Sequence, residues 1–252
     1  KKYLKENNVE KKINLLLRIK LKERTLKTER YFVFGMTSKI VNEQIEKIRT
    51  DEEINSKIEK LGVHFHRKTQ NMSEWDLDYE LSNILEERTF DNVDIINIGG
   101  GLPSVYANTN VDVVKGVFEK VKKLKDFLKE KNVEMMVEPG RFIAAPAGKL
   151  ITKIIGIDKE NIIVNASVYN SDMDAVIVPV KLLIKGELGK ENEGGKAYVV
   201  KGSTPCSMDL FRYRVYLKEP KVGDELVFIN AGAYNFTTDF CDLEKLETEL
   251  VE

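Results

Sequence analysis

The sequence predicts an α/β fold followed by an all-β domain. Between residues 13 and 137, four short apolar segments alternate with longer segments whose apolar residues recur at helical spacing. This alternation is typical of a parallel sheet whose strands are connected through helices. After residue 147 the apolar runs become short and are separated by Gly, Asn and Asp turns, which indicates a β domain. We therefore expect one domain over residues 1–147 and a second over residues 148–252.

Composition narrows the class of protein. The chain has 252 residues, of which 42% are hydrophobic and 32% charged, as in an ordinary globular protein. Its 40 basic and 41 acidic residues leave no basic surplus for binding nucleic acid. No apolar run approaches a membrane span and no signal peptide is recognisable, so we expect a cytoplasmic protein with neither a nucleic-acid nor a membrane partner. Cys206 and Cys241 form no metal-spaced pair, and we expect no metal site.

The first domain is expected to contain four strands, at residues 13–19, 62–66, 93–98 and 135–137. The first of these is apolar nearly throughout, as in a strand buried on both faces of a parallel sheet. Helices are expected at residues 37–60 with Thr37 or Ser38 as the N-cap, at 75–87 with Ser73 as the cap, and at 111–131. Four such units form half of a (β/α)8 barrel. Either the sheet is open and doubly wound, or the other half lies outside this chain.

Several residues that suit a binding site lie at the C-terminal ends of the expected strands or shortly after them. They are Arg18, His66, the run Gly99-Gly100-Gly101, Glu138 and Arg141. In a (β/α)8 barrel this end of the strands carries the active site. Glycines after a strand let backbone N–H groups approach a phosphate, and an arginine beside a glycine turn suits the same group. Glu138 should instead face a cation, such as a protonated ring nitrogen. Pyridoxal 5′-phosphate carries both a phosphate and a basic ring nitrogen.

The second domain is expected to contain six strands separated by short turns. They lie at residues 149–155, 161–165, 176–184, 197–200, 213–217 and 225–229. The turn Val222-Gly-Asp224 leads into the last of them. Runs of this length and spacing are typical of an all-β barrel or sandwich.

The order and spacing of these motifs resemble the C-terminal part of the fold-type III pyridoxal-phosphate decarboxylases, the ornithine/diaminopimelate/arginine decarboxylase family. The resemblance covers essentially the whole chain. It implies the C-terminal half of an alanine-racemase-like (β/α)8 barrel followed by a β-barrel or sandwich domain. It further implies pyridoxal phosphate as the cofactor and decarboxylation of ornithine, lysine, arginine or diaminopimelate, with release of carbon dioxide.

The resemblance also implies roles in the first domain. The run Gly62-Val-His-Phe-His66 resembles a strand whose last histidine stacks on the pyridine ring, and Thr69 would contact the phosphate. Gly99, Gly100 and Gly101 match the phosphate loop, Glu138 the glutamate on the ring nitrogen, Arg141 a phosphate ligand, and Arg18 an arginine near the cofactor. His64 is interpreted as an ordinary strand residue. Arg67 and Lys68 stand where the family usually has an apolar residue and a glycine.

In the second domain, the run from Gly202 to Asp209 resembles a Gly-Pro-x-Cys-x-x-x-Asp motif whose cysteine donates a proton. Aligning its two ends places Cys206 one position late, at the family's specificity position, so both roles stay open for Cys206. Tyr234, in Asn230-Ala-Gly-Ala-Tyr234, matches a tyrosine that reaches the phosphate. Asp172, Asp174 and Asp209 are candidates for binding the substrate.

The family completes its sites across a homodimer interface, so the resemblance implies a homodimer whose other partner is a small-molecule amino-acid substrate. The chemistry needs a lysine that forms a Schiff base with the cofactor, and no lysine here has the family's sequence context for it. We therefore expect that the chain is a fragment that begins after this lysine, and that it is inactive alone.

Two other functions are compatible with this fold. A non-catalytic paralogue could regulate an active decarboxylase, and a chain that natively lacks the lysine would favour that reading. An amino-acid racemase is the other, but racemases of this fold place an arginine on the ring nitrogen, where this chain has Glu138.

Overall fold

The structure is a computed structural model that describes residues 2–7, 11–21, 34–189 and 194–251. The chain forms two compact units. The first contains Lys1–Pro103 and Val111–Pro139, and the second contains Ser104–Asn110 and Gly140–Glu252. Ala145, in the short helices that follow Gly140, is buried in the core of the second unit. The domain boundary at 147/148 stays a prediction, and each unit is described by itself.

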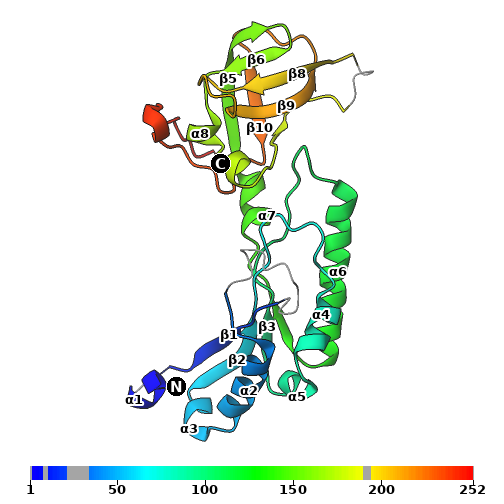
Figure 1. Cartoon of the computed structure of the whole chain (residues 1–252), viewed down its shortest axis with the longest axis vertical. Helices are drawn as coiled ribbons and strands as arrows, with labels where there is room; N and C mark the ends of the chain where they lie inside the picture. The colour runs from blue at the N-terminus through cyan, green and yellow to red at the C-terminus, as the bar shows by residue number, and fades with distance from the viewer. Residues whose placement is uncertain (1, 8–10, 22–33, 190–193, 252) are drawn as a thin grey trace. The chain divides into compact units, whose positions relative to one another are not determined.

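The first unit is built on a sheet of four parallel strands in the order β1-β2-β3-β4 (Figure 1). The strands are β1 (Ile13–Arg18), β2 (Ile58–His64), β3 (Ile95–Asn97) and β4 (Glu134–Met136). The alternation in the sequence correctly predicts their parallel pairing. The register pairs Arg18 with His64, His64 with Asn97, and Asn97 with Met136. These four side chains therefore form one row on one face of the sheet.

The opposite face of this sheet carries the core of the first unit. Val63 and Ile96, one residue before the polar row, are fully buried together with Ile45, Leu81 and Leu124 from the helices. The helices are α1 (Lys2–Glu6), α2 (Ser38–Arg49), α3 (Glu52–Asn55), α4 (Leu77–Ile84), α5 (Glu87–Phe90) and α6 (Val111–Glu130). Figure 1 shows α4 and α6 side by side. None of the helices in the described part of the chain is long and apolar enough to cross a membrane.

The expected helix over residues 37–60 is shorter in the structure. Thr37 caps α2, as expected, by accepting a hydrogen bond from the Ile40 N–H. The helix ends at Arg49 because Asp51 caps a new helix, α3, through the Ile54 N–H. Residues 58–60, which the sequence pattern places in this helix, are the first residues of β2 instead.

The expected cap at Ser73 is also wrong. The Asn71 side chain accepts hydrogen bonds from the N–H groups of Ser73 and Glu74, which holds this segment in a turn. The N-cap of α4 is Asp76, and the helix stops at Ile84, before a separate short helix α5.

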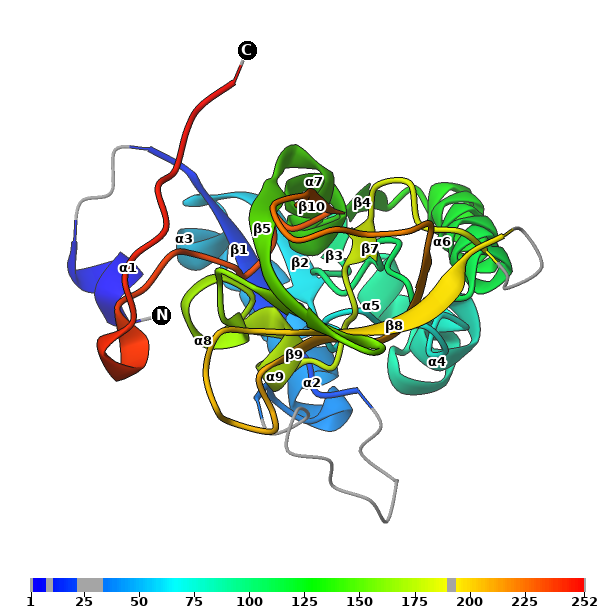
Figure 2. The same cartoon turned by 90° about the horizontal axis from the view of Figure 1, so that it is seen from above.

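The second unit contains a six-stranded sheet in the order β7-β10-β5-β6-β8-β9 (Figure 2). Its strands are β5 (Lys149–Asp158), β6 (Asn161–Val164), β7 (Leu183–Ile184), β8 (Lys196–Lys201), β9 (Leu210–Leu217) and β10 (Glu225–Ile229). All neighbours are antiparallel except β6 and β8. The described residues of this unit also form the α-helices α7 (Gly140–Ala144), α8 (Val168–Ser171) and α9 (Asp174–Ile177) and 3-10 helices at Ala145–Ala147 and Phe240–Asp242.

The expected strand at residues 176–184 is mostly wrong. Its first residues belong to α9, where the Val178 N–H bonds to the Asp174 carbonyl oxygen. Pro179 has no N–H to give to a sheet. Only Leu183 and Ile184 pair as a strand, with β10.

Asp172 is a buried carboxylate between α8 and α9. Its side chain is 0% exposed, and neither oxygen has a hydrogen-bond partner among the described residues. Burial raises its pKa to about 7, the nearby charge of Asp174 adds to the rise, and Lys181 opposes it. Between about pH 4 and pH 7 this carboxyl group therefore holds a proton that it would release in the unfolded chain.

Gly62 is a close-contact position in β2, and replacing it with alanine should destabilise the first unit. A Cβ there would meet the Ile95 carbonyl oxygen at 2.2 Å. Overpacking of this kind costs about 1–3 kcal/mol. Guanidinium unfolding followed by the emission of Trp75, the only tryptophan and fully buried, measures the loss. Gly116→Ala in α6 is the matched control, because its Cβ would meet nothing within 4 Å and should stabilise the helix. Equal midpoints for both variants would contradict this packing.

Asp172→Asn should remove part of the pH dependence of stability. Because the folded-state pKa lies above the unfolded value, the folded chain binds more protons between about pH 4 and pH 7. The wild type therefore loses stability as the pH rises through this window, by at most about 1.4 kcal/mol per pH unit from this group. In thermal melting, the melting temperature of the variant relative to that of the wild type should be higher at pH 8 than at pH 5. A difference that does not change with pH would contradict the assignment.

Candidate active site

The residues that follow the strands extend the polar row of the first unit. Beyond the last paired residues the backbone stays in register, through hydrogen bonds from the Phe65 N–H to Asn97 O (3.0 Å) and from the Glu138 N–H to Gly99 O (2.8 Å). His66, Gly99 and Glu138 therefore come two residues after the first row and on the same face. The structure brings together these three predicted site residues within one unit.

Asn97 connects the glycine turn to Glu138. Its side chain is 3% exposed. Its Nδ2 donates a hydrogen bond to Glu138 Oε1 (2.7 Å), and its Oδ1 accepts one from the Gly99 N–H (2.8 Å). The sequence motifs alone do not identify Asn97 as a residue of the site. The available signal was one amide inside the otherwise apolar segment at the end of a buried strand.

The glycines allow a close approach of two loops. Gly99 has φ +66°, and a Cβ there would meet the Phe65 carbonyl oxygen at 2.3 Å. Gly101 has φ +98°, and its Cβ would meet the Lys68 carbonyl oxygen at 2.7 Å. The N–H groups of Gly99 and Gly100 donate to Asn97 and to His66 Nδ1, the latter at 3.2 Å. Among the described residues, only the Gly101 N–H of these three has no acceptor.

Two histidines face the Glu138 carboxylate. His64 Nε2 lies 3.8 Å and His66 Nδ1 lies 4.0 Å from Glu138 Oε2. The His64 side chain is 19% exposed, whereas Glu138 is about half exposed. Burial lowers the pKa of His64, Glu138 partly opposes this, and Arg18 adds to the lowering. His64 is therefore a neutral imidazole at pH 7, close to the carboxylate. This position differs from the sequence-based expectation of an ordinary strand residue.

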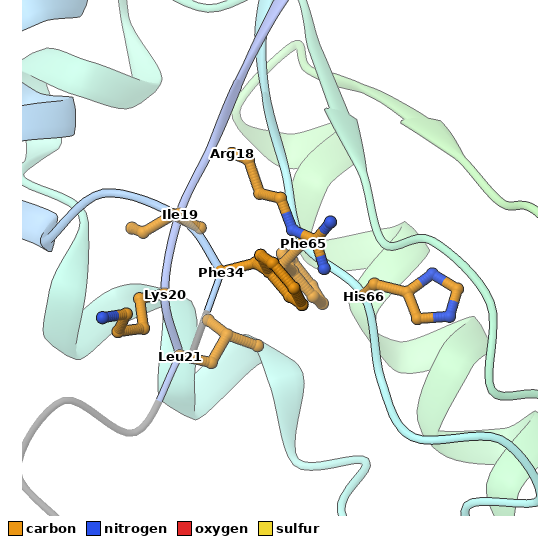
Figure 3. A pocket seen from close by; sticks show the side chains of 7 residues that line it. All are labelled: Arg18, Ile19, Lys20, Leu21, Phe34, Phe65 and His66. Carbon is orange, nitrogen blue, oxygen red and sulfur yellow. The ribbon is translucent and has the colours of Figure 1, made fainter. Parts of the chain in front are cut away.

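Arg18 lies at the end of β1 in a small cleft that also contains His66 (Figure 3). Its guanidinium stacks 5.4 Å from the centre of the Phe34 ring. In Figure 3 it points towards Phe34 and Phe65, while the His66 ring is directed away from them. Its Nε is buried and has no hydrogen-bond partner among the described residues.

Arg67 anchors the loop that leads to Thr69 through partly buried ion pairs. It is fully buried, and its Nη2 donates to Glu80 Oε2 at 2.6 Å, with Glu74 3.8 Å from Nη1. Thr69 lies in the turn that follows, and its contact with a phosphate stays a prediction.

In the second unit, Arg141 and Asp174 bind each other. Both are nearly fully buried, and the two guanidinium nitrogens each donate to one carboxylate oxygen, with Nη2–Oδ1 at 2.9 Å. Arg141 also donates to the Tyr106 hydroxyl (2.8 Å) and lies 4.8 Å from the centre of the Tyr234 ring. Burial opposes its charge, but the bonds to Asp174 and Tyr106 outweigh burial and raise its pKa. The predicted roles of Arg141 on phosphate and of Asp174 on substrate would require this pair to open or to be shared.

The other carboxylates predicted for substrate are also enclosed. Asp172 is fully buried, as described above. Asp209 is 2% exposed and accepts hydrogen bonds from the Val168 N–H (2.9 Å) and from the N–H (3.0 Å) and hydroxyl (2.7 Å) of Thr204. Both Asp209 oxygens are thus engaged in fixing the 202–209 loop. Tyr234 is exposed and has φ +60°.

Cys206 lies on the surface of the second unit. Its Sγ is 3.1 Å from the Tyr169 hydroxyl. This hydrogen bond is the main cause that lowers the pKa of the thiol. Tyr169 was not singled out from the sequence, because nothing in its local pattern indicates a contact 37 residues away.

The residues of the first unit fit the two ends of pyridoxal phosphate. A half-exposed carboxylate that Asn97 holds in place suits a protonated ring nitrogen. The free N–H of Gly101, in a turn after a strand, suits a phosphate oxygen.

Comparisons with known proteins agree with this fit. A family model described as "Pyridoxal-dependent decarboxylase, pyridoxal binding domain" matches residues 3–145. A diaminopimelate decarboxylase of Aquifex aeolicus is 29% identical over 231 residues, which cover 83% of this chain and 52% of that protein. The chain thus spans about half the length of this curated relative.

Solved structures share the fold. The lysine/ornithine decarboxylase of Vibrio vulnificus, complexed with cadaverine, matches this chain with a TM-score of 0.64 at 20% sequence identity. The match covers 92% of this chain and 62% of that chain. The arginine decarboxylase of Paramecium bursaria Chlorella virus has a TM-score of 0.64 at 22% identity, covering 92% and 64%. Because the family model covers more than half of the residues, the chain belongs to the pyridoxal-dependent decarboxylase family, whose cofactor is pyridoxal phosphate.

Proposed function

We propose that this chain is part of an enzyme that decarboxylates a basic or diamino amino acid, namely ornithine, lysine, arginine or diaminopimelate. The observation that carries the proposal is the Glu138 carboxylate, held by Asn97 at the end of β4 and next to His66. Relatives that act on diaminopimelate, lysine or ornithine, and arginine support this substrate class.

Each residue of the first unit has a stated task in the proposal. When bound, pyridoxal phosphate supplies an electron sink for the pair of electrons left by the departing carboxyl group. Glu138 keeps a proton on the ring nitrogen. His66 would stack on one face of the pyridine ring. The Gly101 N–H would donate a hydrogen bond to the phosphate, which Thr69 would also contact. Asn97 fixes Glu138 and the glycine turn together, so it positions both ends of the site.

Release of labelled carbon dioxide from the four carboxyl-labelled amino acids tests the activity, with protein purified from its source. We expect release from one or more of them. Release from none would contradict a decarboxylase and favour a regulatory paralogue. Our expectation from the sequence remains that the 252 residues alone release none.

Glu138→Gln should weaken binding of the cofactor to the 252-residue chain. The probe is 4′-deoxypyridoxine 5′-phosphate, which keeps the ring nitrogen and phosphate but has no aldehyde to react with surface lysines. Loss of a hydrogen bond to a charged group costs about 1.5–3 kcal/mol, or roughly 10–100-fold in affinity. Asn97→Ala should weaken it about tenfold, because Glu138 and Gly99 lose their common partner. Quenching of Trp75 emission and equilibrium dialysis measure the affinity.

Glu134→Gln is the matched control for this experiment. It is the same substitution four residues earlier, on β4, but its side chain pairs with Lys60 and lies outside the site. Glu134→Gln should bind the probe as the wild type does, and inorganic phosphate should bind wild type and Glu138→Gln alike. If Glu138→Gln bound the probe as tightly as Glu134→Gln, the assignment of Glu138 to the ring nitrogen would fail.

We also propose Cys206 as a proton donor, supported by its exposure and its bond to Tyr169. The roles implied for Tyr234 and Arg141 on phosphate, for Arg18 near the cofactor, and for Asp172, Asp174 and Asp209 on substrate remain proposals, as do a homodimer and a cytoplasmic location.

Tyr169→Phe should raise the pKa of Cys206, because the hydrogen bond that stabilises the thiolate is lost. In a Cys241→Ser background, the rate of iodoacetamide alkylation should then rise with pH around a higher midpoint than in wild type. Tyr213→Phe, an exposed tyrosine of the same unit, serves as the control and should leave the midpoint unchanged. Identical midpoints for Tyr169→Phe and Tyr213→Phe would remove the support for this hydrogen bond.

A further inference from the structure

Three metal-ligating side chains converge on one face of the first unit. One nitrogen each of His64 and His66 and one oxygen of Glu138 all lie within 4.8 Å of one another. The convergence follows from the sheet, because His64 and His66 lie two residues apart along one strand direction and Glu138 follows β4 in the same row as His66. Two imidazoles and one carboxylate are the ligand set of open three-residue Zn²⁺ sites.

The orientation of these groups also favours a cation between them. His64 Nε2 is buried and has no hydrogen-bond partner among the described residues. Buried polar nitrogens in proteins normally bind a hydrogen-bond partner or an ion. Asn97 donates to Glu138 Oε1, so that Oε2 is the oxygen 3.8 Å from His64 and 4.0 Å from His66. A hydrogen bond of this kind orients a metal-binding carboxylate.

Solvent can reach the cluster, because the side chains of His66 and Glu138 are 45% and 49% exposed. Two features oppose a cation. Arg18 is paired with His64 across β1 and β2, and its positive charge faces the same imidazole. His66 Nδ1 would also have to exchange its bond from the Gly100 N–H for the metal.

We propose that His64, His66 and Glu138 bind one Zn²⁺ ion in the cofactor-free chain, and that the ion and pyridoxal phosphate exclude each other. The metal site follows from the geometry of the three side chains alone. The exclusion rests on the proposed function, because His66 and Glu138 are the residues assigned to the pyridine ring. One site thus has two competing occupants, and His64 is the ligand that serves only the metal.

Metal titration of the cofactor-free 252-residue chain, after removal of bound metal by a chelator, tests the first half. Co²⁺ gives visible absorption bands when it replaces zinc in nitrogen and oxygen coordination, and Zn²⁺ affinity follows from competition with a chromophoric chelator. We expect one ion per chain. His64→Ala and Glu138→Gln should each weaken Zn²⁺ binding at least tenfold, whereas Glu134→Gln should not.

Arg18→Met provides a test that does not remove a ligand. Loss of the neighbouring positive charge should tighten Zn²⁺ binding several-fold and most strongly at low ionic strength. Far-UV circular dichroism and Trp75 emission verify that each variant is folded. Zn²⁺ affinity that is unchanged in folded His64→Ala or Glu138→Gln, or that does not respond to Arg18→Met, would overturn the site.

Competition with 4′-deoxypyridoxine 5′-phosphate tests the second half. Its apparent affinity should fall in proportion to the free Zn²⁺ concentration in wild type, and should be nearly independent of Zn²⁺ in His64→Ala. Simultaneous binding of both would overturn the exclusion while leaving the metal site in place. A metal-free chain that does not bind the probe would count against the proposed function instead, so the two failures are distinguishable.

Discussion

The side chain of Asn97 is the constraint on which the geometry of the first unit's site depends. A buried amide must satisfy both its oxygen and its nitrogen, and Asn97 does so with the Gly99 N–H and with Glu138. These two bonds connect segments that lie about forty residues apart in the sequence. They leave one Glu138 oxygen facing the histidines and use one of the three glycine N–H groups. The same amide therefore fixes the charge at one end of the site and the backbone turn at the other.

The elements of the first unit could be predicted well from the sequence, since the alternation of apolar strands and amphipathic helices depends only on local periodicity. The errors lie where a side chain competes with the helix for backbone groups. Asp51 divides one expected helix by capping a new one, and Asn71 holds the segment at Ser73 in a turn. In the second unit, the apolar run around Pro179 resembles a strand in composition, but it begins in α9 and only its last two residues, Leu183 and Ile184, form a strand. Such outcomes depend on individual hydrogen bonds and not on pattern.

The candidate site could be predicted in part. Strand ends in a parallel sheet meet at one edge, so the grouping of His66, Gly99 and Glu138 follows from order alone. The partners of these residues could not be predicted, because they come from the register of neighbouring strands. His64 of the first row shows this, since it faces Glu138 only because β2 and β4 are both paired with β3. The ion pair of Arg141 with Asp174 is likewise a contact between residues 33 positions apart that no local motif indicates.

That ion pair has a consequence for how the chain can diverge over time. Removing one partner of a buried pair leaves an uncompensated charge, which costs about 3–5 kcal/mol, a large part of the 5–15 kcal/mol that typically stabilises a domain. A lineage that loses either Arg141 or Asp174 alone therefore passes through a poorly folding ancestor. The two positions should therefore change together, because a substitution at one of them is tolerated only when the other is substituted as well.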